Sequence, residues 1–163
     1  MATKGMEESK DPLIELYRTL EEALAIAGSR SKSESGLSLD TAELELKLSS
    51  ATKVGGGIEL KPLGVDLSAH ASSESAHNYK LKLRRSGKPF FAGSPPAMEL
   101  AETILALAKA TDAIILRASE FEVVEAVVTV DVTQTKDGSV KIWAGGGGSS
   151  GNVHKITMTF AKH

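Results

Sequence analysis

One order of sequence patterns occurs twice along the chain, and this repetition limits the possible folds more than any other feature. In each half, a stretch with apolar residues three and four positions apart precedes three shorter stretches in which apolar and polar residues alternate. The first pattern is typical of an amphipathic helix, and the second is typical of a strand with one buried face. The sequence therefore predicts an α+β fold, in which each half forms a helix followed by three antiparallel strands.

The two halves also correspond residue by residue, which favours a tandem duplication (αβββ-αβββ). The corresponding blocks, without a gap between them, are 15–20 with 99–104 and 42–48 with 126–132. The loop before the last strand is shorter in the second half, and there we pair Leu81 with Ile156. The alternative is two unrelated segments that share common local patterns.

The repeat divides the chain into a disordered N-terminal tail (1–10), a first unit (11–85), a linker (86–96) and a second unit (97–163). A single unit is small for an independent hydrophobic core. The two units could therefore pack helix against helix, or join their edges into one six-stranded antiparallel sheet. In either arrangement we expect an approximate two-fold axis between the units.

The expected helices have recognisable starts. Asp11 and Ser94 are N-cap residues, and each precedes a proline, which suits the first position of a helix. The first helix is expected to end at Gly28. The serine-rich residues 29–36 are then expected to form a loop.

Composition excludes several classes of protein. The net charge of −2 lacks the basic excess of a general nucleic-acid binder, and the absence of cysteine excludes a disulfide scaffold or a thiolate metal site. No apolar run approaches the roughly 18 residues that a membrane-spanning helix requires. The polar first residues lack the apolar segment of a signal peptide, so we expect a cytoplasmic protein.

No residue pattern specifies a catalytic, cofactor-binding or metal site. The four histidines lack the spacing of a zinc site. The string Gly146-x-Gly148-x-x-Gly151 resembles a phosphate-binding loop, but a strand is expected after it, where such a loop requires a helix. We therefore expect a protein that is not an enzyme and that has no cofactor.

Candidate partner-binding residues lie on the third expected strand and in the linker. Lys80, Lys82 and Arg84 alternate along that strand, so their charges share its solvent-facing side. They could bind an anion or an acidic partner, or they could protect an edge strand against aggregation. Phe90 and Phe91 could anchor the linker between the units, or they could expose a surface for a partner.

Further candidates, His154 and Lys155, open the last expected strand. Residues 147–160 form a glycine- and serine-rich loop followed by His-Lys-Ile-Thr-Met-Thr-Phe. This segment resembles the closing motif of the trypsin-co-occurring domain, second type, which is a small bacterial domain. Residues 65–83 resemble the same motif, although Tyr79 stands in place of the histidine and lysines stand in place of the threonines.

The resemblance implies an accessory module of bacterial conflict and signalling proteins, which occurs beside trypsin-like proteases or NTPases. Such a module is expected to mediate protein–protein contacts, and the resemblance assigns no catalytic residue to this chain. A trypsin-like protease or an NTPase is therefore an expected partner. The chain could also form a homo-oligomer.

The sequence favours a non-enzymatic adaptor that binds another protein through an exposed sheet edge or through its glycine- and serine-rich loops. In this interpretation, a proline or a charge placed in the last strand abolishes partner binding while the fold survives. The alternative is a small-molecule or anion-binding protein, with its site between the two repeats and with the basic residues Lys80, Lys82 and Arg84 at the mouth of that site.

Overall fold

The computed structural model describes residues 11–52, 55–62, 76–90, 92–134, 140–142 and 153–162. These residues form an α+β fold, as the sequence predicts, and their two helices and six-stranded antiparallel sheet include the joined sheet that was one of the two expected arrangements. The expected tail at 1–10, Phe91 and the glycine run at 145–148 lie outside the described residues.

Two long helices begin where the sequence predicts. α2 (Pro12–Ser35) has Asp11 as its N-cap, and its carboxylate accepts a backbone N–H of the first turn at 2.9 Å. α3 (Pro95–Arg117) has Ser94 as its N-cap, and its hydroxyl accepts a backbone N–H at 3.4 Å. A proline follows each cap, where its missing N–H costs no hydrogen bond.

The expectation that the first helix ends at Gly28 is wrong. The helix continues to Ser35 and ends at Gly36, whose φ of 79° is the left-handed conformation of a helix C-cap. Gly28 lies inside the helix, where a Cβ atom would meet Cδ of Arg85 at 2.7 Å. Gly28 therefore makes room for a side chain that is distant in sequence, and it does not end the helix.

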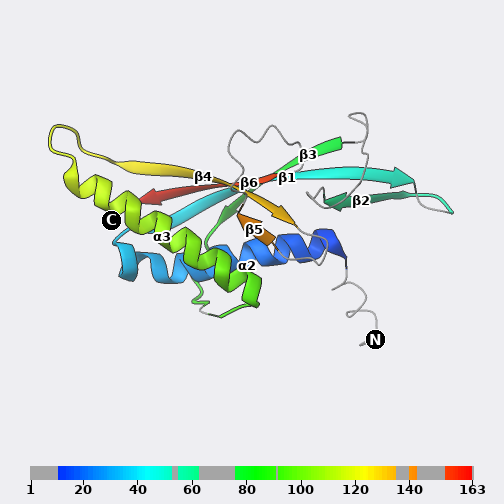
Figure 1. The fold of residues 1–163 in the computed structure, drawn as a ribbon, viewed down its shortest axis with the longest axis horizontal. Helices are drawn as coiled ribbons and strands as arrows, with labels where there is room; N and C mark the ends of the chain where they lie inside the picture. The colour runs from blue at the N-terminus through cyan, green and yellow to red at the C-terminus, as the bar shows by residue number, and fades with distance from the viewer. Residues whose placement is uncertain are drawn as a thin grey trace.

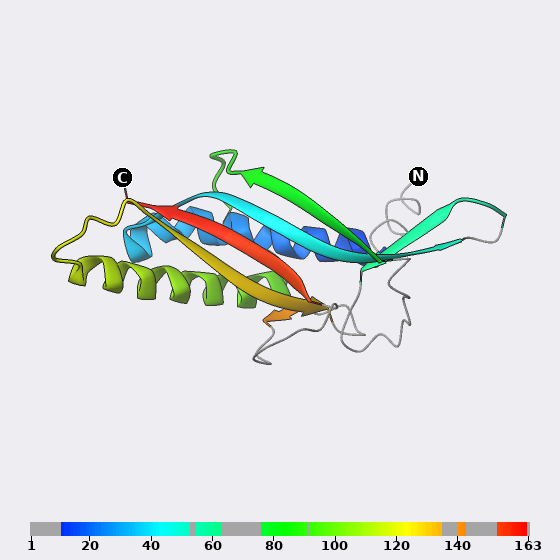
Figure 2. The same cartoon turned by 90° about the horizontal axis from the view of Figure 1, so that it is seen from above.

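Six strands form one sheet, and every pairing is antiparallel. Their bounds are β1 (Ser38–Thr52), β2 (Ile58–Pro62), β3 (Ala76–Arg84), β4 (Glu125–Gln134), β5 (Val140–Ile142) and β6 (His154–Ala161). β1 pairs with β3 over residues 41–49 on one side. On its other side β1 pairs first with β6, over residues 38–45, and then with β2, over residues 48–52. β4 lies beyond β6, and β5 lies beyond β4, so the order across the sheet is β3-β1-β6-β4-β5 (Figure 2).

The expected two-fold axis between the halves is not confirmed. The sheet joins unlike strands of the two halves, because β1 pairs with β6, whereas a two-fold axis joins equivalent surfaces. The helices also run in the same direction. Arg30 of α2 contacts Glu102 of α3 at 2.6 Å, and further along both helices Glu34 contacts Lys109 at 3.5 Å. The two halves thus lie side by side along one sheet.

The strand registers change one correspondence between the halves. Leu44 of β1 lies opposite Leu81 of β3, and Val128 of β4 lies opposite Met158 of β6. Since Leu44 corresponds to Val128 in the sequence, the registers pair Leu81 with Met158, and not with Ile156 as the sequence suggested. An alternating pattern looks the same after a shift of two residues, so the pattern alone does not fix the register.

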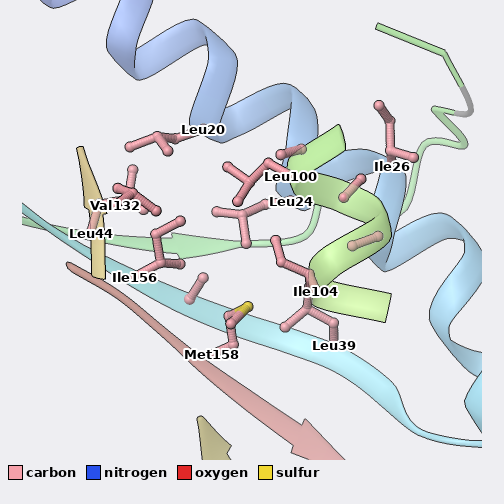
Figure 3. Close-up of a cluster of buried hydrophobic side chains, with 14 of the residues drawn as sticks. Leu20, Leu24, Ile26, Leu39, Leu44, Leu100, Ile104, Val132, Ile156 and Met158 are labelled. Atoms are coloured by element: carbon pink, nitrogen blue, oxygen red, sulfur yellow. The ribbon is translucent and has the colours of Figure 1, made fainter. Parts of the chain in front are cut away.

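The apolar core lies between the two helices and one face of the sheet (Figure 1). Inward side chains of β1 and β6 meet those of α2 and α3 there (Figure 3). Labelled members of this cluster are Leu20, Leu24, Ile26, Leu39, Leu44, Leu100, Ile104, Val132, Ile156 and Met158. Among the described residues no helix covers the opposite face, which carries mainly charged and hydroxyl side chains.

Candidate interaction surface

β3 forms an open edge of the sheet, since in the described part of the chain it pairs only with β1. The backbone N–H of Lys47 on β1 points to the other side, toward β6. The backbone groups of the preceding Leu46 therefore point at its partner Tyr79 on β3. Because successive residues alternate, the N–H and C=O groups of Lys80 and Lys82 point outward, where a further strand can pair with them.

The side chains of β3 offer two kinds of contact beside this open backbone. Lys80, Lys82 and Arg84 are exposed on the face of the sheet away from the helices, as the alternating pattern predicts. Tyr79 and Leu81 lie on the helix side, yet 43% and 37% of their surfaces stay exposed, because α2 packs on β1 and β2 instead. Basic and apolar side chains thus flank a strand edge that can accept an extended segment.

A groove with a volume of about 460 Å³ lies at the end of β3, between α2, the start of β1 and the loop that follows β3. Leu24, Leu83 and Phe90 contribute apolar surface to this groove. Arg84 and Lys88 also line it and add positive charge. The groove continues the β3 edge, so a segment bound along the edge can place a side chain in it.

The linker after β3 is held against α2 by its backbone. The N–H of Phe90 donates to Oγ of Ser29 at 2.9 Å, and the N–H of Ser94 donates to Oε1 of Glu22 at 3.0 Å. The main chain thus anchors the linker, while the side chain of Phe90 lines the groove and is partly exposed. The roles expected for Phe91 lie outside the described residues.

One carboxylate beside the groove is already engaged. Glu21 lines the groove, and its Oε2 accepts the phenolic O–H of Tyr17 at 2.6 Å, one helical turn away. This hydrogen bond stabilises the protonated phenol and raises the pKa of Tyr17 to about 12. Glu21 is therefore fixed in place at the side of α2 that faces the groove.

The structure places His154 and Lys155 away from any open edge. Both belong to β6, which pairs with β1 on one side and with β4 on the other. His154 is fully buried, and Nζ of Lys155 lies 4.0 Å from Oδ1 of Asp131 on β4. A buried side chain cannot meet a partner, so His154 has no place in the candidate surface. The expectation that a proline in the last strand leaves the fold intact is wrong, because β6 is paired on both sides and a proline there would break pairing inside the sheet.

A second open edge lies on β4, and the sequence pattern did not predict it. β6 pairs with one side of β4, while β5 covers only residues 132–134 of the other side, so residues 125–131 have no further strand partner among the described residues. Large apolar side chains stand exposed beside this edge. Phe121 is 81% exposed, Val124 is 75% exposed and Val127 is 58% exposed.

The chain leading into this second edge carries acidic residues. Glu120, Glu122 and Glu125 are exposed and lie close in sequence to Phe121 and Val124, while Lys162 also lies beside these two residues. Two features of the sequence indicate this surface. Phe121 is an aromatic residue between two glutamates, and Val127 occupies a position in β4 where the alternation calls for a polar residue.

Among the described residues, no group of three or more histidine, aspartate or glutamate side chains is arranged to hold a metal ion. No described helix is both long enough and apolar enough to cross a membrane. In comparisons with protein-family models, with curated proteins and with solved structures, the chain matches none of them.

Proposed function

We propose that this protein is a non-enzymatic interaction module, which binds an extended, acidic segment of a protein partner along the open edge of β3. The observation that carries the proposal is the outward-pointing backbone of Lys80 and Lys82 beside exposed basic and apolar side chains. A bound segment would add a strand to the sheet, with main-chain hydrogen bonds for affinity and side-chain contacts for specificity.

Protection of an edge strand against aggregation does not explain every feature of this surface. Lysines on an edge strand do deter aggregation. However, that role does not require exposed apolar residues such as Tyr79 and Leu81, and it does not require a groove at the end of the strand. These features favour binding, and the positive charge of Lys80, Lys82 and Arg84 favours an acidic partner.

We also propose that the two halves arose by tandem duplication. In each half, a long strand pairs with a short strand at the end of one edge and with a longer strand along its other edge. The long strands are β1 and β4, and the longer neighbours are β3 and β6. β2 pairs with the end of β1 as β5 pairs with the end of β4. The resemblance of the last-strand motif to the trypsin-co-occurring domain favours a trypsin-like protease or an NTPase as the partner, in a bacterial cytoplasm.

A proline variant at the β3 edge tests the proposal. Lys82→Pro removes an outward N–H but leaves the hydrogen bonds between β1 and β3, so the fold should survive. The matched variant Lys82→Thr removes the charge and keeps the N–H. A partner captured from extract of the native source should be lost with Lys82→Pro and only weakened with Lys82→Thr. Capture of the same partner by a folded Lys82→Pro variant would overturn the edge site.

A second candidate function, binding of an organic anion, is favoured by the groove. Its volume of about 460 Å³ is typical of small-molecule sites, and Arg84 and Lys88 supply positive charge. This groove belongs to the first half and the linker, and not to the junction between the repeats that the sequence analysis suggested. A rise in melting temperature with phosphorylated metabolites that disappears in Lys88→Glu would support this function.

A further inference from the structure

We propose that the segment bound at the β3 edge is the β4 edge of a second copy of this chain, in place of the protease or NTPase that the resemblance favours, so that copies assemble head to tail. This inference rests on the proposed function, because it uses the same β3 edge. The two open edges of one molecule differ in charge and in sequence. A contact between them is therefore heterologous, and it leaves one open edge at each end of the assembly.

The joint between the two halves of one chain shows that such a contact fits the sheet. β6 of the second half pairs with β1 of the first half in an antiparallel sense. β4 runs in the same direction as β1, and β3 runs in the same direction as β6. A neighbour's β4 placed beside β3 is thus antiparallel as well, and the helices of both copies lie on the same side of the continued sheet.

The register of the proposed joint follows from the same template. Glu45 lies opposite Lys155 within the chain. Moving β1 to its counterpart β4, and β6 to its counterpart β3, turns this pair into Thr129 of the second copy opposite Asn78. Four residues further along the antiparallel strands, Lys82 lies opposite Glu125 of the second copy. In this register the backbone groups of both residues point into the joint, since the alternation that turns Lys82 outward on β3 also turns Glu125 and Val127 outward on β4.

The two edges differ in charge, and the register brings Lys82 opposite Glu125, while Lys162 lies beside Phe121 and Val124 at the second edge. Residues 77–88 contain five basic side chains and no acidic one, namely Lys80, Lys82, Arg84, Arg85 and Lys88. Residues 118–130 contain three acidic side chains and no basic one, namely Glu120, Glu122 and Glu125. Like edges would repel each other, so the charges disfavour symmetric pairs of β3 with β3 or of β4 with β4.

The joint also covers the exposed apolar residues of both edges. On the helix side, the register places Leu81 opposite Ala126 and Leu83 opposite Val124 of the second copy. Phe121 precedes this pairing, so it lies beside the loop after Arg84, where the groove of about 460 Å³ opens. An aromatic side chain that is 81% exposed in one copy therefore has an apolar groove to enter in the next.

Sedimentation velocity at increasing protein concentration tests the assembly. The unmodified chain should form species larger than a dimer, because each joint leaves two open edges. Lys82→Pro and Val127→Pro, which each remove one outward N–H, should both remain monomeric. Lys82→Thr and Val127→Thr keep the N–H groups and should still assemble. Circular dichroism confirms that each variant is folded.

A mixture of the two proline variants gives the sharper test. Lys82→Pro retains an intact β4 edge, and Val127→Pro retains an intact β3 edge. The mixture should therefore form one joint per pair and stop at a one-to-one heterodimer. Assembly that persists in Val127→Pro would overturn the proposal, since a symmetric β3 contact does not need β4. A mixture that stays monomeric would overturn it as well.

Photo-crosslinking separates this inference from the proposed function. A photoreactive phenylalanine analogue in place of Lys80 is irradiated in extract of the native source. Crosslinks to residues 118–130 of a second copy support self-assembly. Crosslinks to a different protein, from a chain that stays monomeric, overturn self-assembly and leave the edge-binding function standing. Absence of any protein crosslink, together with a monomeric chain, overturns both.

Discussion

The imidazole Nδ1 of His154 accepts a hydrogen bond from the backbone N–H of Lys47, with 3.0 Å between the two nitrogens. The contact lies at a gap in the sheet. Pairing of β1 with β6 ends at Glu45, and pairing of β1 with β2 begins at Leu48. The ring of His154 fills this gap and satisfies an N–H that neither strand reaches, which explains why a histidine stands in the core at the start of β6.

Replacing His154 with phenylalanine keeps the ring and removes the acceptor. Loss of a partner for a partly buried N–H should lower the free energy of unfolding by about 1–3 kcal/mol. Hydrogen exchange should show faster exchange at the Lys47 amide than at its neighbours on β1. Met158→Val is the matched control, since it disturbs a fully buried residue of the same strand and leaves the acceptor. Equal protection of the Lys47 amide in both variants would contradict the role of His154.

Gly28 and Arg85 form a second contact that a double-mutant cycle can test. Alanine usually stabilises a helix interior by about 0.5–1 kcal/mol relative to glycine. Here the new Cβ would lie 2.7 Å from Cδ and 2.9 Å from Nε of Arg85, so the end of that side chain must move and Gly28→Ala should give less than this gain. In an Arg85→Ala background the same substitution should recover it. Thermal unfolding of the four proteins measures the coupling, and additive effects would show that Arg85 does not constrain Gly28.

Tyr17 provides a pH-dependent test of α2. Its hydrogen bond to Glu21 raises the pKa of the phenol from 10.0 to about 12, so the folded chain holds this proton more tightly than the unfolded chain. The contact therefore stabilises the fold below pH 10 and loses its contribution as the pH rises toward 12.

Tyrosinate absorbance measures this shift directly. In a Tyr79→Phe background, only Tyr17 titrates as a tyrosine. At pH 11 about a tenth of it should be ionised, whereas an ordinary tyrosine would be about nine-tenths ionised. Adding Glu21→Ala should move the pKa of Tyr17 down toward 10. A titration that Glu21→Ala leaves unchanged would rule out the hydrogen bond as the cause.

The sequence predicts those features whose causes are local. Asp11 and Ser94 begin helices because each cap satisfies N–H groups within a few residues. The alternation in β1 and β6 correctly separates the buried face from the exposed face. Gly28 was misinterpreted because the residue that explains it, Arg85, is brought beside it only by the tertiary fold.

The order of strands across the sheet could not be predicted from the sequence. Alternation shows which face of a strand is buried, but it does not show which strand lies beside it. His154 therefore looked like a surface residue of a terminal strand, although β6 lies between β1 and β4. The basic residues of β3 were found from their pattern, whereas the second edge with Phe121 and Val127 became visible only once β4 was placed beside β6.

Exchange of charges across the proposed joint tests its register. Lys82→Glu would place two carboxylates opposite each other, and Glu125→Lys would place two ammonium groups opposite each other. Each single reversal should weaken association of copies by about tenfold, which corresponds to roughly 1.4 kcal/mol. The double variant, Lys82→Glu with Glu125→Lys, restores opposite charges at every joint and should recover the association.

The same series distinguishes a paired register from general electrostatic attraction. The double variant has the same net charge as the unmodified chain, so a change in net charge cannot explain a recovery. Because both side chains are exposed, the difference between single and double variants should shrink as salt rises and screens the pair. Lys80→Glu with Glu125→Lys is the control, since the register places Lys80 opposite Val127. If this control recovered association as well as the first pair did, the assigned register would be wrong.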